Sequence, residues 1–259
     1  MITLTKTATE FGDITIAQSR VVGSHIYWQG GWQQREADRN GVSLAAYVHA
    51  IFGLLAQTSA RATLMIGCGG GTLGTMLART GRSVIVVDIN PQSIALARQY
   101  FSLPEHVTCY VEDGASFLKR NQAVFDAVII DAFIEAKVPR HLCSVEFFRL
   151  VRERLAPEGC VFMNVYLQHG SDLSADVIAG RMAHAGFPVR VLASPGPVER
   201  NAIVMGGAVA TLHEPTLLMK PEVLQDEIMA DLRNMHFRSG HKSWSSRTAD
   251  ESNCLDQTP

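Results

Sequence analysis

The chain has 259 residues and a formal net charge of -2 at pH 7, and its Lys and Arg residues form no block. This pattern offers no basic footprint for a nucleic acid, so we expect no nucleic-acid partner. Hydrophobic residues make up 47% of the chain, which suits a globular protein. The longest nearly apolar run, 44–56, is too short to span a bilayer, so we expect no membrane partner. The length allows one large α/β domain with a small addition.

The spacing of cysteines and histidines argues against disulfides and metal sites. Five cysteines are scattered without a CxxC pair, as expected of reduced thiols in a cytoplasmic protein. Residues 1–13 contain no apolar stretch of the kind found in signal peptides. The nine histidines form neither HxH nor HExxH, so we expect no metal cofactor.

The first fifty residues differ from the rest of the chain. Short β-type runs between 13 and 36 are broken by Gly23 and by Gly30-Gly31, which predicts a small antiparallel piece of two or three strands. From 42 to 57 the pattern becomes helical. We therefore expect an N-terminal β region over 1–50 and a nucleoside-binding main domain over 51–210.

The main domain alternates apolar strands with helices. Seven strand-like segments occur at 63–66, 83–88, 106–111, 125–131, 160–165, 189–194 and 201–207. Among the helical segments, the one at 90–101 begins with the N-cap Asn90 and with Pro91, and the one at 144–159 is expected to stop at Pro157. Continuous apolar strands that alternate with helices predict a sheet covered on both faces. The expected fold class is α/β, with a doubly wound, mostly parallel seven-stranded sheet.

A last helix is expected within 211–236. The segment 221–235 places five apolar residues on one helical face, namely Val223, Leu224, Ile228, Leu232 and Met235. We favour packing on the protein's own domain over binding of a partner, because such stripes usually belong to a core. The polar, aperiodic tail 237–259 is expected to be disordered.

A glycine-rich loop follows the strand at 63–66. It contains Gly67, Gly69, Gly70, Gly71 and Gly74. Without Cβ atoms the backbone can turn sharply and approach a ligand, although the same composition also suits a simple tight turn. Asp88 ends the second strand, Asp113 follows the third and Asp131 ends the fourth, all at the carboxyl edge where ligands bind in such sheets. The loop and the three acids together predict a binding site.

These residues separate three classes of ligand. A P-loop is excluded because no Lys follows Gly74. A dinucleotide fits the GxGxxG spacing, with Asp88 19 residues after Gly69, but it leaves the two later acids without a role. An S-adenosyl sulfonium ligand uses all of them, and Gly67-x-Gly69-x-Gly71 would pass under its amino-acid end.

Each acid has an expected role around that ligand. Asp88 would hold the ribose hydroxyls, Asp113 the adenine amine, and Asp131 would face the reacting centre. An amine nucleophile must lose its proton before it attacks, and Asp131, assisted by Tyr47, is the best candidate base. Without such roles, Asp131 would be a strand-end cap and Tyr47 a packed aromatic residue.

Several motifs fit one known family. They are GCGGG (67–71), VVDIN (86–90), Asp113-Gly114, FDAVIID (125–131) and EFFRLVRERLAPEGCVFMNV (146–165), with QGGWQ (29–33) and YVH (47–49) upstream. From about Phe11 to Gly207 the chain resembles the spermidine synthase family within the class I S-adenosylmethionine-dependent fold. The resemblance implies cofactor contacts from Gln33 and from the glycine and acidic motifs, and a substrate contact from Tyr47. It also implies a homodimer, S-adenosylmethionine or its decarboxylated form as cofactor, and a small-molecule amine as acceptor.

The departures from the family concern its acidic residues. The acid of its glycine motif, which holds the aminopropyl amine, is Gly70 here. The second acid of its DxxDP motif falls on Ile134, with Glu135 adjacent as a substitute, and the Glu of its YHE falls on His49. Glu135 and His49 are therefore the substrate-binding candidates. Gly70 also predicts less discrimination against S-adenosylmethionine, because an acid there would repel the carboxylate of that cofactor.

Four functions are compatible with the sequence. The first is a spermidine synthase-like transferase that moves an aminopropyl group to an amine. The second is a methyltransferase on the same scaffold, and the third is a catalytically silent nucleoside-binding or dimer-forming module. A NAD-dependent oxidoreductase is a more distant fourth. Release of methylthioadenosine, release of S-adenosylhomocysteine, or binding without turnover distinguishes the first three.

Overall fold

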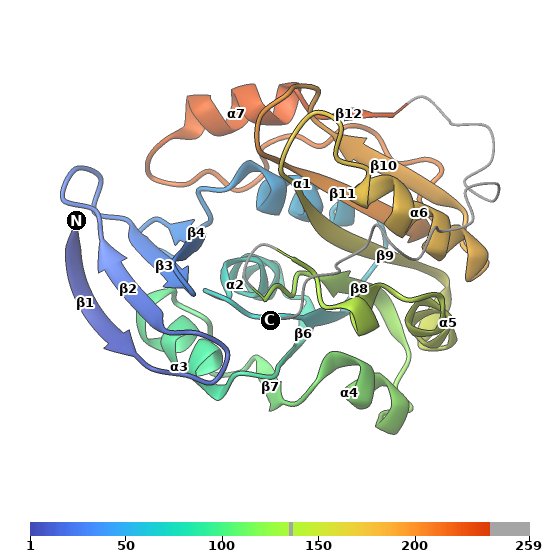
Figure 1. The fold of residues 1–259 in the computed structure, drawn as a ribbon, viewed down its shortest axis with the longest axis horizontal. Coiled ribbons are helices and arrows are strands. Elements are labelled where there is room, and N and C mark those ends of the chain that lie inside the picture. Colours follow the sequence, from blue (N-terminus) through green and yellow to red (C-terminus); the bar gives the residue numbers. More distant parts are fainter. Residues whose placement is uncertain (135–136, 239–259) are drawn as a thin grey trace.

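The computed structural model describes residues 1–134 and 137–238 (Figure 1). Glu135 and the part of the predicted tail beyond 238 lie outside these residues, so the predictions made for them stay predictions. The described chain forms a mostly parallel sheet with helices on both faces and a small antiparallel sheet at the N-terminus. The expected α/β class is therefore confirmed.

The N-terminal sheet has four antiparallel strands, more than the two or three predicted. They are β1 (Ile2–Thr7), β2 (Ile14–Gln18), β3 (His25–Gln29) and β4 (Trp32–Ala37), in that order across the sheet. Tyr27 of β3 pairs with Arg35 of β4, whereas the next residue of β3 pairs with Gln33. Gln34 is thus the extra residue of a β-bulge, a feature that bends a strand and redirects its side chains.

The main sheet has eight strands in the order β12-β10-β11-β9-β8-β5-β6-β7. The parallel strands are β5 (Ala62–Ile66), β6 (Ser83–Asp88), β7 (Thr108–Val111), β8 (Phe125–Ile130) and β9 (Leu155–Leu167). The antiparallel ones are β10 (Val189–Ala193), β11 (Arg200–Gly207) and β12 (His236–Phe237). All seven predicted strands are present, and the eighth, β12, is a two-residue addition that pairs with β10.

Helices cover both faces of the main sheet (Figure 1). They are α1 (Ala46–Leu55), α2 (Thr72–Arg79), α3 (Pro91–Tyr100), α4 (Gly114–Arg120), α5 (Val145–Glu153), α6 (Ser174–His184) and α7 (Gln225–Arg233), with a 3-10 helix, η1 (Arg140–Cys143). The helices α1, α2 and α7 share one apolar cluster with the sheet, and α4, α5 and α6 share a second cluster on the opposite face. Burial on both sides explains why the strands read as continuous apolar runs. Among the described residues no helix has the length and hydropathy needed to cross a membrane.

The helix α7 packs on α1 in the first of these clusters through Ile228 and Leu232, and Met235, just after the helix, joins the same cluster. Leu224 does not share this face, since it precedes the helix with a φ of 58° and is 39% exposed. The predicted stripe is wrong at Val223 and Leu224, because the helix begins only at Gln225 and neither residue belongs to the cluster.

The strand β9 begins earlier than predicted. The helix expected over 144–159 ends at Glu153, and Leu155 already pairs with Phe125 of β8. The register then shifts between Phe125 and Ala127, and such an irregularity tolerates Pro157, which has no N–H to donate. Pairing with β8 therefore prevails over the helical pattern of these residues.

The N-terminal sheet is attached to α3. A third apolar cluster joins them and includes Ile16, Tyr27, Leu96 and Phe101. The hydroxyl of Tyr27 also lies 3.0 Å from that of Ser93 in α3. This attachment holds β4 next to the carboxyl edge of the main sheet.

Candidate active site

The glycine loop connects β5 to α2, and Gly67 opens it. Gly67 has a φ of +94°, and a Cβ at this position would lie 2.3 Å from the carbonyl oxygen of Asp131. Its N–H donates to the carbonyl of Val87, near the end of β6, at 2.8 Å. Glycine is required here because the loop passes against the backbone of the neighbouring strand ends.

Asp88 ends β6 and fastens the glycine loop to it. Its carboxylate accepts hydrogen bonds from the backbone N–H of Cys68 at 2.6 Å and of Asn90 at 2.8 Å. Burial raises the pKa of Asp88, although the nearby backbone N–H groups oppose this effect. Carboxylate oxygens have further lone pairs, so Asp88 can accept additional hydrogen bonds while it holds the loop.

A cavity lies at the carboxyl edge between the glycine loop, the end of β6 and the end of β8; we call it the nucleoside cavity. Six predicted residues line it, namely Gly67, Gly69, Asp88, Asp113, Gly114 and Asp131. The structure therefore brings together the glycine loop and all three acids, as a ligand at this edge requires.

Asp113 lines the nucleoside cavity and also caps α4. Its Oδ1 accepts a hydrogen bond from Ser116 N–H at 2.9 Å, and its Oδ2 lies 2.6 Å from Nε2 of His141. Burial acts to raise the pKa of Asp113, but these two partners outweigh it and hold the pKa below its usual range. His141 reaches the cavity from η1, and no sequence pattern marked it.

Asp131, the predicted base, is buried just after β8, and both of its carboxylate oxygens have a donor. Oδ2 lies 2.6 Å from Nη2 of Arg35, and Oδ1 accepts from Nδ2 of Asn164 at 2.9 Å. Asn164 in turn accepts from Nδ2 of Asn201 at 2.9 Å. This network fixes the orientation of the carboxylate.

Arg35 is the main site residue that the sequence analysis missed. Its side chain is only 7% exposed although it comes from the small sheet. Burial acts to lower the pKa of Arg35, but Asp131 and Tyr47 raise it, and the net direction is upward. One Arg in a short polar strand gives no sequence signal. Asn164, a lone amide in the apolar run of β9, does give one.

Tyr47 extends from α1 towards Arg35. The guanidinium carbon of Arg35 lies 5.3 Å from the centre of the Tyr47 ring, a cation–π contact. The Tyr47 hydroxyl is buried beside the carboxylate of Asp131. Burial raises the pKa of Tyr47, and Asp131 adds to this while Arg35 opposes it. The phenol therefore stays protonated and can donate a hydrogen bond beside Asp131.

Two further cavities continue from this point. A connecting cavity shares Gln34 and Phe133 with the nucleoside cavity, and it is also lined by Arg35 and Tyr47. An outer cavity of about 750 Å³ shares Arg35 and Tyr47 with the connecting one and extends to α7. A ligand bound across the three cavities would therefore pass Arg35 and Tyr47.

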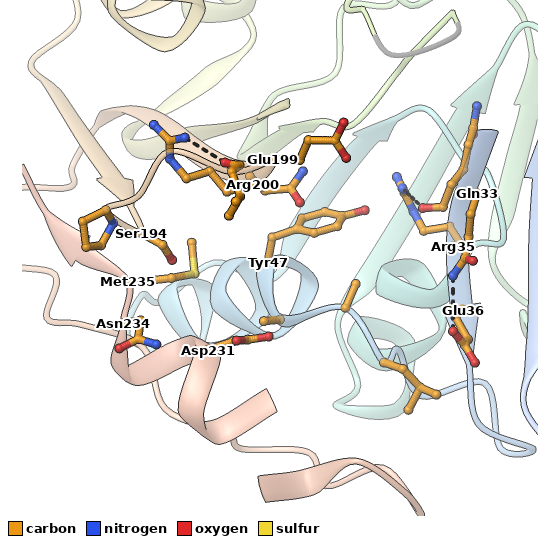
Figure 2. Close-up of a pocket in the computed structure, with 17 residues that line it drawn as sticks. Gln33, Arg35, Glu36, Tyr47, Ser194, Glu199, Arg200, Asp231, Asn234 and Met235 are labelled. Atoms are coloured by element: carbon orange, nitrogen blue, oxygen red, sulfur yellow. Dashed lines mark hydrogen bonds between the residues drawn. The ribbon is translucent and has the colours of Figure 1, made fainter. Parts of the chain in front are cut away.

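The outer cavity is rich in carboxylates (Figure 2). Glu36, Glu199 and Asp231 line it, together with Arg35 and Arg200. Figure 2 shows Tyr47 in the middle of this space, with its hydroxyl directed towards Arg35. Asp231, on α7, lies below Tyr47 in this view. The cavity thus offers acceptor groups for a cation at some distance from Asp131.

Two predicted contacts lie elsewhere than expected. Gln33 lines the connecting and outer cavities rather than the nucleoside cavity, and its amide donates to Glu36 at 3.2 Å. His49 is fully buried within α1, with Nε2 2.7 Å from the carbonyl oxygen of Ser43. Burial lowers the pKa of His49. The structure therefore makes His49 a neutral core residue, which corrects its prediction as a substrate contact.

Gly70 and Gly71 face the interior rather than the nucleoside cavity. A Cβ on Gly70 would lie 3.2 Å from the ring of Phe101. Gly71 is the N-cap of α2 with a φ of 65°, and a Cβ there would lie 2.9 Å from that of Ala97. Both glycines let the loop pack tightly against α3 and its C-terminal end. Ile134, at the position of a family acid, is 54% exposed at the rim of the nucleoside cavity.

Comparisons of the sequence show which known proteins the chain is similar to. A family model described as a methyltransferase domain matches residues 63–159. The polyamine aminopropyltransferase of Chromobacterium violaceum is 31% identical over 166 residues, 62% of this chain and 62% of that protein. The enzyme of the same name from Neisseria meningitidis serogroup A is 31% identical over 169 residues, again 62% of each chain. The N-terminal histidine N-methyltransferase of Emericella nidulans is 28% identical over 169 residues, 59% of this chain and 30% of that protein. The chain thus matches about three fifths of the length of the two aminopropyltransferases.

Comparisons of the structure extend the likeness to most of the chain. A probable spermidine synthase from Corynebacterium glutamicum superposes with a TM-score of 0.71 at 19% identity, covering 90% of both chains. The spermidine synthase of Thermotoga maritima gives a TM-score of 0.63 at 15% identity, covering 89% of this chain and 84% of that one. These matches show that the chain shares the fold of these two proteins, and the sequence resemblance to the two aminopropyltransferases covers about three fifths of it.

Proposed function

We propose that the protein is a transferase of the polyamine aminopropyltransferase type. It moves the three-carbon, amino-bearing chain of an adenosyl sulfonium donor from the sulfur to an amine acceptor. The observation that carries the proposal is Asp131, a buried carboxylate that lines the nucleoside cavity and binds two residues of the connecting cavity. The names of the two aminopropyltransferases support the same activity.

The nucleoside cavity would hold the donor through residues with distinct tasks. Asp88 would accept the ribose hydroxyls, and Asp113 would accept from the adenine amine. The loop from Gly67 to Gly69 would let the sulfonium chain pass close to the backbone. When bound, the donor supplies a carbon that is activated by its bond to a positively charged sulfur.

Asp131 and Tyr47 would prepare the nucleophile. An alkylamine is mostly protonated at neutral pH, so its proton must leave before the nitrogen attacks. Asp131 would take that proton, while the Tyr47 hydroxyl would donate to the carboxylate or orient the amine. The burial of both side chains excludes water from the reacting atoms.

The outer cavity supports an acceptor with a second cationic group. Glu199 and Asp231 would attract an ammonium group, and both line the outer cavity but not the nucleoside cavity. Glu36 lines the outer cavity as well, on the side of Arg35 (Figure 2). A diamine could then place one nitrogen near Asp131 and the other among these acids.

The test is to incubate the purified protein with decarboxylated S-adenosylmethionine or with S-adenosylmethionine and a panel of linear diamines. We expect methylthioadenosine as the nucleoside product, read by liquid chromatography and mass spectrometry. S-Adenosylhomocysteine would instead establish methyl transfer. Tight nucleoside binding without any product across the panel would make the protein a silent binding module.

We also propose that the reaction needs no metal and that the enzyme is a homodimer. A sulfonium leaves as a neutral thioether and requires no Lewis acid, so a chelator should leave the rate unchanged. The homodimer follows from the family resemblance, and sedimentation would show a mass of two chains. A rate that falls with the chelator and returns with added metal would refute the first part.

A further inference from the structure

Arg35 lies where the donor's side chain must pass. A Cβ built on Gly69 would be 3.5 Å from Cγ of Arg35 and 3.7 Å from its Nε, so the guanidinium stem covers the glycine loop. The other end of the same side chain reaches Asp131 at 2.6 Å. The chain attached to the sulfonium of a bound donor would therefore meet the buried guanidinium of Arg35, between the glycine loop and Asp131.

One more donor points to the same place. Nε2 of Gln34 is buried without a hydrogen-bond partner among the described residues. Gln34 lines all three cavities, because the bulge in β4 turns it towards their junction. Buried donors normally have partners, so unpaired ones beside a cavity indicate a ligand that accepts hydrogen bonds.

The acid at this junction is already engaged. Both carboxylate oxygens of Asp131 are bonded, one to Arg35 and one to Asn164, so Asp131 is poorly placed to hold a lone amine as well. The hydrogen bonds of the Arg35 side chain to described residues go to Asp131 and to the carbonyl of Gln34. A guanidinium carries five N–H donors, so it can serve a second carboxylate as well.

We propose that Arg35, with Gln34, binds the carboxylate of S-adenosylmethionine, so that the group transferred is 3-amino-3-carboxypropyl rather than aminopropyl. This inference rests on the proposed function, because it concerns the same donor and the same attacked carbon. It assigns Arg35 as the residue that selects the donor.

The reaction balances without another reactant. The lone pair of the acceptor nitrogen forms a bond to the chain carbon next to sulfur, and the bond between that carbon and sulfur breaks. Its electron pair stays on sulfur, which becomes the neutral thioether of methylthioadenosine. The proton of the amine passes to Asp131 and then to solvent. The product is an amine that carries a new amino group and a new carboxylate.

Binding measurements test the carboxylate subsite without turnover. Calorimetry should show S-adenosylmethionine binding more tightly than the decarboxylated form to the wild-type chain. In Arg35→Gln the affinity for S-adenosylmethionine should fall about tenfold or more, as for loss of a charge-assisted bond. Affinity for methylthioadenosine, which has no such tail, should stay within about twofold in the same comparison.

Two further variants keep the experiment decisive. Arg35→Gln leaves Asp131 buried without its cation, so the double variant Arg35→Gln/Asp131→Asn removes both charges and should show the same loss of preference. Arg149→Gln removes an exposed arginine of α5 and should leave all three affinities unchanged. A wild-type chain that binds the decarboxylated form tenfold more tightly, or a preference that survives both Arg35 variants, would overturn the inference.

The products separate this inference from the proposed function. Methylthioadenosine and a carboxyl-bearing amine from S-adenosylmethionine would support both. Methylthioadenosine from the decarboxylated donor alone would uphold the proposed function and refute the inference. No product from either donor would refute the proposed function, whereas the affinities would still report on the carboxylate subsite.

Discussion

Asp131 is held by one charged and one neutral donor, and these two bonds serve different purposes. The bond from Asn164 fixes one oxygen, and the bond from Arg35 compensates the buried negative charge. A proton accepted from an amine would have to enter this network, so the carboxylate is positioned for transfer before a substrate arrives.

Asp131→Asn should lose turnover and keep donor affinity. An amide cannot take a proton, and loss of general-base catalysis costs a factor on the order of 10²–10⁴ in rate. Rates of methylthioadenosine release and calorimetry with methylthioadenosine check this. Asp126→Asn, at the other end of β8, where the carboxylate binds the N–H of Arg61 and Ala62, is the matched control and should retain the rate. An Asp131→Asn rate close to that of the control would remove Asp131 as the base.

The role proposed for Asp88 makes nucleoside binding depend on pH. Its pKa is raised by burial, and its ionised form would be the one that accepts two ribose hydroxyls. Affinity for methylthioadenosine should therefore be constant at high pH and fall about tenfold per pH unit below the raised pKa. The fall should begin at a higher pH than the value of about 3.9 at which an ordinary Asp titrates.

The control for this pH dependence is Asp88→Asn, whose affinity should be lower and flat with pH. Asp113 cannot produce the same curve, because its pKa is shifted downward and it stays ionised through that window. If the affinity of Asp88→Asn for methylthioadenosine depended on pH in the same way as that of the wild-type chain, the role given to Asp88 would be contradicted.

At the scale of elements, the glycine loop combines an unusual backbone conformation with a close contact. Gly67 has a positive φ and also lies against the carbonyl of Asp131. Gly81, after α2, has a φ of +75° but open space around its Cβ position. A comparison of substitutions at Gly81 and Gly67 therefore distinguishes the effect of backbone strain alone from that of strain combined with a collision between strand ends.

Gly81→Ala should lower the free energy of unfolding by about 1–2 kcal/mol, the cost of a left-handed alanine. Gly67→Ala carries the same strain plus a collision at 2.3 Å with backbone atoms that cannot move aside easily. It should therefore cost more stability and also weaken methylthioadenosine binding, since β5 and β8 must separate. Urea unfolding and calorimetry measure both effects. Equal losses in the two variants, with binding intact, would show that the loop relaxes.

At the scale of the whole molecule, the ion pair between Arg35 and Asp131 joins the two sheets. Arg35 comes from the N-terminal sheet and Asp131 from the main sheet, 96 residues later, and both side chains are almost fully buried. The contact between Tyr27 and Ser93 joins the same two parts farther from the site. Assembly of the catalytic centre therefore depends on docking of the small sheet.

Arg35→Met should lower the free energy of unfolding by about 3–5 kcal/mol, because it leaves a buried carboxylate unpaired. The double variant Arg35→Met/Asp131→Asn should recover most of this loss, since no isolated charge remains. Urea unfolding of both single variants and the double variant forms the cycle. Additive losses would show that the pair contributes no coupling and that docking relies on the apolar contacts alone.

The sequence by itself determined the fold class and the ligand edge. Continuous apolar strands that alternate with helices predict a sheet that is covered on both faces. Parallel strands in such a sheet bring their carboxyl ends to one edge. The glycine loop and the acids Asp88, Asp113 and Asp131 could therefore be placed together, because each lies a short, fixed distance after a strand. These are local features, and the periodicity of the chain encodes them.

The tertiary structure alone decided which side chains meet across the two sheets. Arg35 reaches Asp131 only because the N-terminal sheet packs on α3 and a bulge turns β4, and neither contact has a local signature. The exclusion of His49 from the site depends in the same way on how α1 packs, since one turn of a helix offers both buried and cavity-facing positions. Pairing between distant strands also set the start of β9. The charge of the donor subsite is thus a property of long-range packing, which sequence spacing does not encode.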